Sequence, residues 1–286
     1  MAAAVSFIPL SAFRIPHFAA CFFGLLTLAC AAEEVPGRQP EQPTFPDIVA
    51  RIRCGIGIVG TYNPANRPSL EYLASGFFYS NQGHFATAHH VLAAVEERKR
   101  LRDLRVFLPS DANREGHPAT VLATDPRHDV AVLLVKGGNF FPLELGESAR
   151  AREGQAIALC GFPLAALFDV HPATFAGIIS SISPIAVPVQ PGTPLKAEMR
   201  EALRSPFNVF QLDATAYPGH SGGPLFDPKT GKVLGIVNSG FIRKTKEQLL
   251  STGITYAMPI HLARPTLDEA LKAKPALLPM PPSGLK

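Results

Sequence analysis

The sequence has little excess of either charge, no long hydrophobic run and little helical periodicity. Its 27 Lys and Arg face 23 Asp and Glu, so the net charge is only +4, which argues against a nucleic-acid-binding protein. Its uncharged apolar stretch over residues 18–32 is shorter than the roughly 20 residues that a membrane span needs. Hydrophobic residues make up 47% of the chain, which excludes intrinsic disorder and provides for a sizeable core.

The uncharged N-terminal stretch has a cation before it and two acidic residues after it. This arrangement predicts a secretory signal peptide over residues 1–32, with an uncleaved N-terminal anchor as the alternative. Lipidation at Cys30 is a further option. The sequence therefore predicts an exported protein, periplasmic or secreted, with no stable membrane span in its mature chain.

Two proline-rich segments flank the central part of the chain, and we expect a linker over 33–46 and a tail over 272–286. Between them, over 47–271, short apolar runs alternate with Gly, Pro, Asn and Asp. Such spacing is typical of a β-barrel or β-sandwich. The runs expected to form strands are 56–59, 76–79, 130–135, 156–160, 175–179, 209–212 and 233–237.

Helical patterns are confined to three short stretches, at 91–104, 196–203 and 265–272. In the last of these, Pro265 is expected at the first helical position. Cys54 and Cys160 fall in apolar, strand-like runs, and we expect two buried thiols, although an oxidising compartment would permit a disulfide between them.

Three segments carry the residue types of a nucleophilic hydrolase. The segment 83–91 ends in a histidine pair, 125–135 places an acidic residue directly before an apolar run, and 213–225 embeds Ser221 among glycines. A serine hydroxyl needs an imidazole to accept its proton and a third group to orient that imidazole. The glycines leave the backbone free to aim N–H groups at an oxygen that becomes negative.

In this order, the three segments resemble the motifs of a chymotrypsin-fold serine protease, and most closely its HtrA-type (Deg) branch. Thr87-Ala-His-His-Val91 is similar to the Thr-Ala-Ala-His motif, and Asp125-Pro-Arg-His-Asp-Val-Ala131 to Asp-Pro-x-x-Asp-x-Ala. Gly219-His-Ser-Gly-Gly-Pro-Leu225 matches Gly-Asn-Ser-Gly-Gly-Pro-Leu except at its second residue.

The resemblance covers about residues 47–271 and implies an all-β fold of two packed six-stranded antiparallel β-barrels with short helices. The first barrel would span about 47–145 and the second about 150–260. HtrA proteases usually continue into a PDZ module, and we expect none here because few residues follow Ile260.

The resemblance also implies the roles of individual residues. His90 would be the general base and then the acid, Asp129 the orienting carboxylate, and Ser221 the nucleophile. The N–H groups of Gly219 and Ser221 would form the oxyanion hole. The expected substrate pocket, with its base first, comprises Thr215, Asn238, Ser239, Gly240 and Gly253.

The function implied is a serine-type endopeptidase that hydrolyses exposed or unfolded polypeptides without a cofactor. Because Thr215 is not a carboxylate, we expect cleavage after small or medium aliphatic side chains. Activity should fall below about pH 6, where a histidine base takes up a proton. His220 stands where many secreted relatives have an Asp that captures a freed N-terminus, and we expect it to be an exposed bystander.

Other interpretations of the same residues remain open. Gly219-His-Ser-Gly-Gly223 also satisfies the Gly-x-Ser-x-Gly elbow of esterases, but that motif requires a helix directly after the serine, whereas 227–232 indicates a hairpin. Asp125 competes with Asp129 as the acid, although we expect it to cap its own turn. His84, His89 and His90 match no zinc spacing, so no metal is expected. A protease scaffold that only binds peptides is the non-enzymatic alternative.

Overall fold

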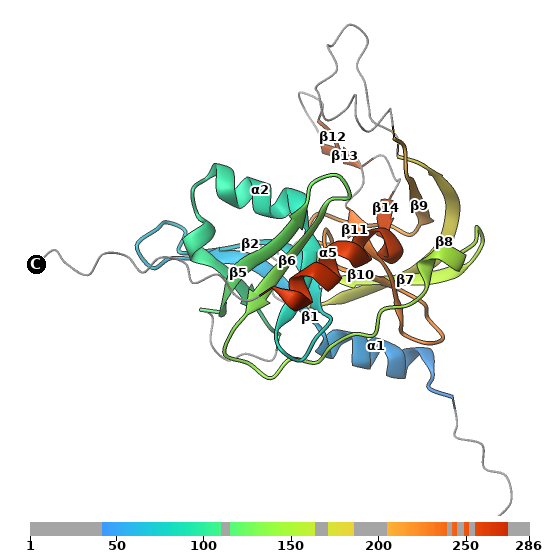
Figure 1. Cartoon of the computed structure of the whole chain (residues 1–286), viewed down its shortest axis with the longest axis horizontal. Coiled ribbons are helices and arrows are strands. Elements are labelled where there is room, and N and C mark those ends of the chain that lie inside the picture. The colour runs from blue at the N-terminus through green and yellow to red at the C-terminus, as the bar shows by residue number, and fades with distance from the viewer. Residues whose placement is uncertain are drawn as a thin grey trace, which may run out of the picture. The chain divides into compact units, whose positions relative to one another are not determined.

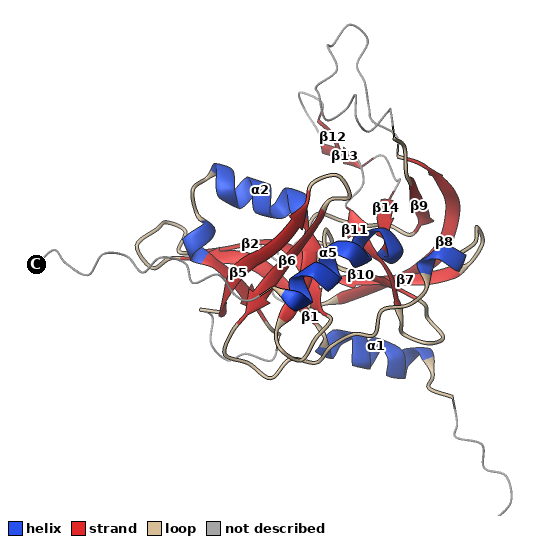
Figure 2. Ribbon diagram, in the orientation of Figure 1, coloured by secondary structure: helices blue, strands red, loops and turns tan. Residues whose placement is uncertain are grey.

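The computed structural model describes residues 42–109, 115–163, 171–185, 205–238, 242–244, 249–251 and 255–273. These residues form two closed antiparallel β-barrels with short helices around them (Figure 1, Figure 2). Each barrel has six strands, as predicted. The signal-peptide prediction and most of the predicted linker and tail lie outside the described residues.

The first barrel extends from residue 56 to 135, in the strand order β1-β2-β3-β6-β5-β4. Strand β6 is almost wholly buried, which its uninterrupted run of Val, Ala and Leu predicts. It pairs with β3 so that Ala88 lies opposite Val130. The six strands are β1 (Ile56–Tyr62), β2 (Leu70–Phe78), β3 (His84–Ala88), β4 (Leu104–Phe107), β5 (His117–Asp125) and β6 (Val130–Val135).

The second barrel extends from residue 156 to 259, in the strand order β10-β11-β14-β9-β8-β7. A separate two-stranded sheet consists of β12 (Ile242–Lys244) and β13 (Leu249–Ser251). All the runs expected as strands coincide with strands in the two barrels. The strands of the second barrel are β7 (Ala156–Gly161), β8 (Ala173–Pro184), β9 (Asn208–Asp213), β10 (Pro224–Phe226), β11 (Val233–Asn238) and β14 (Thr255–Pro259).

The hairpin predicted after Ser221 is present. Strand β10 starts three residues after Ser221 and pairs antiparallel with β11. The Asp227 carboxylate closes the connecting turn by accepting the N–H groups of Lys229 (2.7 Å) and Thr230 (3.1 Å). A strand therefore stands where an esterase elbow would require a helix, and the esterase interpretation is wrong.

The helices differ from the prediction at both ends of the domain. The first helix, α1 (Phe45–Cys54), was not predicted and begins inside the expected linker, where Thr44 and Asp47 form a capping box. The last, α5 (Ile260–Lys272), starts at Ile260, so Pro265 lies inside the helix and not at its first position. Strand β14 runs directly into α5, and burial of Ile260, Ala263 and Leu267 offsets the hydrogen bond that the proline loses.

The predicted helix at 91–104 is present in two parts, α2 (His89–Glu97) and the short 3₁₀ helix η1 (Leu101–Asp103), and a second 3₁₀ turn is η2 (Ser148–Arg150). The third expected helix, at 196–203, lies outside the described residues. No helix in the described part of the chain is long and apolar enough to cross a membrane.

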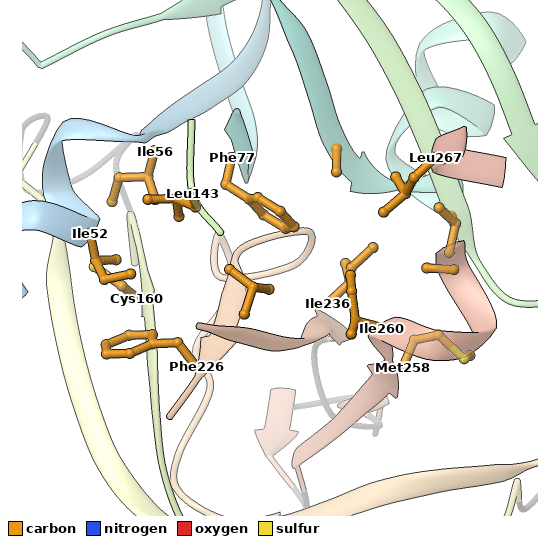
Figure 3. Close-up of a cluster of buried hydrophobic side chains, with 14 of the residues drawn as sticks. Ile52, Ile56, Phe77, Leu143, Cys160, Phe226, Ile236, Met258, Ile260 and Leu267 are labelled. Carbon is orange, nitrogen blue, oxygen red and sulfur yellow. The ribbon is translucent and has the colours of Figure 1, made fainter. Parts of the chain in front are cut away.

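One buried hydrophobic cluster is shared by the two barrels and by α1 and α5 (Figure 3). The segment between the barrels contacts both of them, because Leu143 N–H donates to Phe78 O (2.8 Å) and Gly146 N–H to Val233 O (2.8 Å). The hydrophobic cluster and this connecting segment together join the barrels into a common core. Among its members are Ile52, Ile56, Phe77, Leu143, Cys160, Phe226, Ile236, Ile260 and Leu267.

Both described cysteines are free. Cys160 is buried in β7, as predicted, and burial raises the pKa of its thiol. The prediction for Cys54 is wrong, because this residue ends α1 and is exposed. The apolar run that follows it becomes a strand only from Ile56 onward.

Candidate active site

His90 and Asp129 meet in the first barrel, where the end of β3 lies beside the start of β6. His90 is the second residue of α2, which follows β3 directly, and Asp129 immediately precedes β6. One carboxylate oxygen of Asp129 accepts the backbone N–H of His90 (2.7 Å), and the other contacts His90 Nδ1 (2.7 Å). The carboxylate therefore fixes both the backbone and the ring of His90.

The backbone of Asp129 has an unusual conformation, with φ of 52°. This left-handed region is uncommon for residues other than glycine, and Asp and Asn are among those that tolerate it. In this conformation the carbonyl of Asp129 accepts the N–H of His89 (3.1 Å) while its carboxylate faces His90. The strained residue is thus the one on which the orientation of the imidazole depends.

The second barrel also contacts this carboxylate. Asn238, at the end of β11, donates from Nδ2 to Asp129 Oδ2 (2.6 Å). The sequence predicts Asn238 only as a pocket wall, and the structure shows that its amide also contacts the carboxylate of Asp129. Because Nδ1 of His90 is bound to Asp129, the imidazole keeps Nε2 for a reacting group, and the side chain is 46% exposed.

Ser221 follows a tight turn in the second barrel. The turn consists of residues 217–220, and the N–H of His220 donates to Tyr217 O across it (3.0 Å). Gly219 has φ of 103°, and a proline followed by such a glycine is typical of a type II turn. Ser221 itself is 5% exposed.

The residue after Ser221 packs against the strand that leads to His90. A methyl group on Gly222 would collide with Thr87 and lie 2.9 Å from the backbone nitrogen of Ala88. Gly222 also has φ of 82°, so both its conformation and its surroundings require glycine. The turn that carries Ser221 therefore lies against the end of β3, from which His90 projects.

Ser75 on β2 connects the first barrel to this turn, and no sequence motif points to it. Its backbone N–H donates to Ser221 O (2.9 Å), and its hydroxyl donates to Gly219 O (2.6 Å). The same hydroxyl accepts the N–H of Phe162 (2.9 Å), just beyond β7. Ser75 is fully buried at the junction of the two barrels.

His220 is buried, so the expectation of an exposed bystander is wrong. Its ring stands edge-on to Phe175, with 5.2 Å between ring centroids, and its Nδ1 accepts the N–H of Tyr217 (3.0 Å). Burial lowers the pKa of His220 to about 4. The imidazole beside Ser221 is therefore uncharged at neutral pH.

Asp125 and three further histidines have structural partners. Asp125 caps its own turn, as predicted, by accepting the N–H groups of Arg127 (3.0 Å) and His128 (3.1 Å). His84 contacts Ser80 Oγ (2.9 Å). His117 contacts Lys136 O (3.2 Å) and His261 contacts Ser148 Oγ (2.8 Å). Among the described residues, no cluster of three or more His, Cys, Asp or Glu could hold a metal ion.

The predicted substrate pocket is only partly described. Thr215, its expected base, follows β9 and is exposed, and the next residue, Ala216, donates its N–H to Thr255 Oγ1 (2.9 Å). Asn238 is partly buried and contacts Asp129. Ser239, Gly240 and Gly253 lie outside the described residues, so the pocket stays a prediction.

Two six-stranded barrels, with a His–Asp pair from one and a glycine-flanked serine from the other, define a chymotrypsin-like serine peptidase fold. In agreement, the sequence model of the trypsin-like peptidase domain matches residues 74–236, more than half of the chain. The chain belongs to this family.

The relatives are of the HtrA type, as the sequence motifs predicted. A probable periplasmic serine endoprotease, DegP-like, from Pseudomonas putida (strain F1) is 33% identical over 194 residues, which is 68% of this chain and 34% of that protein. Its counterpart in Ectopseudomonas mendocina (strain ymp) is 32% identical over 213 residues, or 74% and 38%. The chain thus spans about a third of the length of these relatives.

A solved structure of the HtrA-type protease AlgW with a decapeptide has the same fold. It matches 80% of this chain and 68% of its own, with a TM-score of 0.56 and 25% sequence identity. A structure of AlgW with a tripeptide matches with a TM-score of 0.55 and 26% identity, covering 80% of this chain and 64% of its own. The two-barrel architecture is therefore that of HtrA-type proteases.

Proposed function

We propose that this protein is a serine endopeptidase that hydrolyses exposed or unfolded polypeptides through an acyl-enzyme, with Ser221 as nucleophile, His90 as base and Asp129 as orienting acid. The observation that carries the proposal is the double contact of Asp129 with His90, made next to the turn of Ser221. Membership of the trypsin-like peptidase family supports it.

The chemistry follows from these contacts. With the Nδ1 proton of His90 directed to Asp129, Nε2 accepts the proton of the Ser221 hydroxyl as its oxygen attacks the substrate carbonyl. The carbonyl oxygen becomes negative and is stabilised by the N–H groups of Gly219 and Ser221. His90 then gives its proton to the amine as the C–N bond breaks. Water next attacks the acyl carbon and passes a proton to His90, which returns it to the Ser221 oxygen as the ester bond breaks.

The proposed pocket comprises Thr215, Asn238, Ser239, Gly240 and Gly253. Thr215 offers no carboxylate to a Lys or Arg side chain, so we propose cleavage after small or medium aliphatic residues. The relatives named as periplasmic endoproteases favour an exported protein, and we propose from the sequence that residues 1–32 are its signal peptide. No cofactor enters the proposed reaction.

The test is cleavage of unfolded casein by the purified protein and by its Ser221→Ala variant. We expect the substitution to lower the rate by roughly 10⁶-fold, because the attacking oxygen is lost. A fluorophosphonate that labels activated serines should modify the wild-type protein and spare the variant. If both proteins cleave casein equally, or if neither is labelled, the proposal is wrong and the alternative of a peptide-binding scaffold is favoured.

A further inference from the structure

Every polar group of Ser75 is hydrogen bonded, and two of its partners belong to the turn of Ser221. Its N–H donates to Ser221 O (2.9 Å) and its hydroxyl to Gly219 O (2.6 Å). Its carbonyl accepts the hydroxyl of Thr87 (2.8 Å), on the strand that leads to His90. Ser75 thus connects the turn before Ser221 with the strand that leads to His90, although it belongs to none of the three sequence motifs.

The contact with Gly219 bears on the proposed oxyanion hole. The Gly219 carbonyl belongs to the peptide unit that joins Gly219 to His220. That unit lies between the two units that carry the proposed donors, the N–H groups of Gly219 and Ser221. Glycine changes its backbone torsions at low cost, so a turn with Gly219 at φ of 103° keeps one orientation only where its peptide units are held.

The surroundings of Ser75 leave its hydroxyl one direction in which to donate. The N–H of Phe162 occupies the oxygen from the side of the second barrel (2.9 Å), which directs the hydroxyl proton to Gly219. A methyl group on Gly161 would lie 2.6 Å from Ser75 Oγ, and one on Gly223 would touch Ser75 Cβ at 3.4 Å. These glycines provide the space in which Ser75 and the turn approach each other.

From this geometry we infer that Ser75 is a positioning residue for peptide-bond cleavage, whose hydroxyl holds the Gly219–His220 peptide unit so that the flanking N–H groups converge on the oxyanion. The inference rests on the proposed function. Ser75 acts through the turn and does not contact the substrate. Its loss should therefore weaken stabilisation of the transition state and leave binding of the substrate almost unchanged.

The experiment compares Ser75→Ala with the wild-type protein on a peptide substrate taken from a casein cleavage site. We expect kcat, expressed per site titrated with fluorophosphonate, to fall about 10-fold or more, and KM to stay within about twofold. The loss of kcat should be smaller than the roughly 10²–10³-fold loss caused by removing a whole oxyanion-hole donor. A peptide aldehyde, whose adduct with serine carries an oxyanion, should bind more weakly by the same factor as kcat. The cleaved product peptide should bind equally to both proteins.

Ser148→Ala is the matched control. Ser148 is also fully buried, and its hydroxyl contacts the N–H (2.9 Å) and the ring of His261 (2.8 Å). Its loss should lower the melting temperature to a similar extent without changing kcat or the affinity for the aldehyde. If Ser75→Ala does not fold, Ser75→Cys, which keeps a weak donor in the same place, should show a smaller loss of kcat at unchanged KM.

The outcomes separate the two proposals. Normal kcat and aldehyde affinity in Ser75→Ala, or in Ser75→Cys where the alanine variant does not fold, would overturn the inference and leave the proposed function intact. Equal losses of kcat in the Ser75 and Ser148 variants would also overturn it. If the wild-type protein shows no cleavage that is lost on substitution of Ser221, the proposed function and this inference are both refuted.

Discussion

At the scale of single residues, the candidate site depends on a few backbone conformations that only certain residues adopt. Asp129 has a positive φ, which directs its carbonyl to His89 and its carboxylate to His90. Gly222 has a positive φ and touches β3. The sequence motifs around these positions therefore specify backbone geometry as well as the side chains of the candidate site.

His220 makes stability sensitive to acid. Its pKa is about 4 in the folded protein and near 6.5 when the side chain is exposed, so below about pH 6.5 the unfolded chain takes up a proton that the folded chain does not. The contribution of His220 to the free energy of unfolding is therefore fully present above this pH and is lost as the pH decreases toward 4. At pH 5 the loss of unfolding free energy from this residue is about 2 kcal/mol.

The variant His220→Asn replaces the imidazole with an amide that can accept the Tyr217 N–H and does not titrate. We expect its melting temperature to decrease less than that of the wild-type protein between pH 7 and pH 5. Some acid sensitivity should remain, because burial also lowers the pKa of His84 and of His261. His171→Asn, at an exposed histidine, is the control, and identical pH profiles for wild type and His220→Asn would contradict the prediction.

At the scale of elements, strands were easier to predict than helices. The strand runs were recognised because each is a short apolar segment bounded by turn residues, such as the run that becomes β6. Helix α1 was missed because its two buried residues, Ile48 and Ile52, are preceded by a proline-rich segment typical of a linker. The Thr44–Asp47 capping box was the signal that could have revealed it.

Helix α1 is expected to contribute to stability through a narrow apolar face formed by Ile48 and Ile52. Ile52 is fully buried in the common core, so Ile52→Ala should lower the unfolding free energy by about 3 kcal/mol, measured by urea denaturation. Ala50→Gln, at an exposed position of the same helix, should change it by about 0.5 kcal/mol or less. A loss below about 1 kcal/mol for Ile52→Ala would show that α1 is not part of the folded core.

At the scale of the whole molecule, the sequence predicted the two barrels and the three motifs but not the contacts between barrels. Ser75 and Gly219 are 144 positions apart, and Asp129 and Asn238 are 109 apart. No local pattern of hydrophobicity or turn residues reports such pairs, because they depend on how the finished barrels pack. The order of the motifs was informative since the family keeps it.

The shared core leads us to expect that the two barrels unfold together. Calorimetry should show one transition whose measured enthalpy equals the van't Hoff enthalpy. Phe77→Ala in the first barrel and Phe226→Ala in the second should each move the whole transition to a lower temperature, because both side chains belong to the common cluster. Two transitions, each moved by only one substitution, would show that the barrels are independent.

The uncharged setting of His220 has a consequence for how the turn before Ser221 is held in place. Neutral groups hold the turn before Ser221: His220 accepts the N–H of Tyr217 within the turn, and Gly219 O accepts the hydroxyl of Ser75. The turn calls for no counter-ion from an amino terminus liberated by an upstream cut. We therefore expect this turn to take up its conformation as the chain folds, without a charge supplied by an amino terminus.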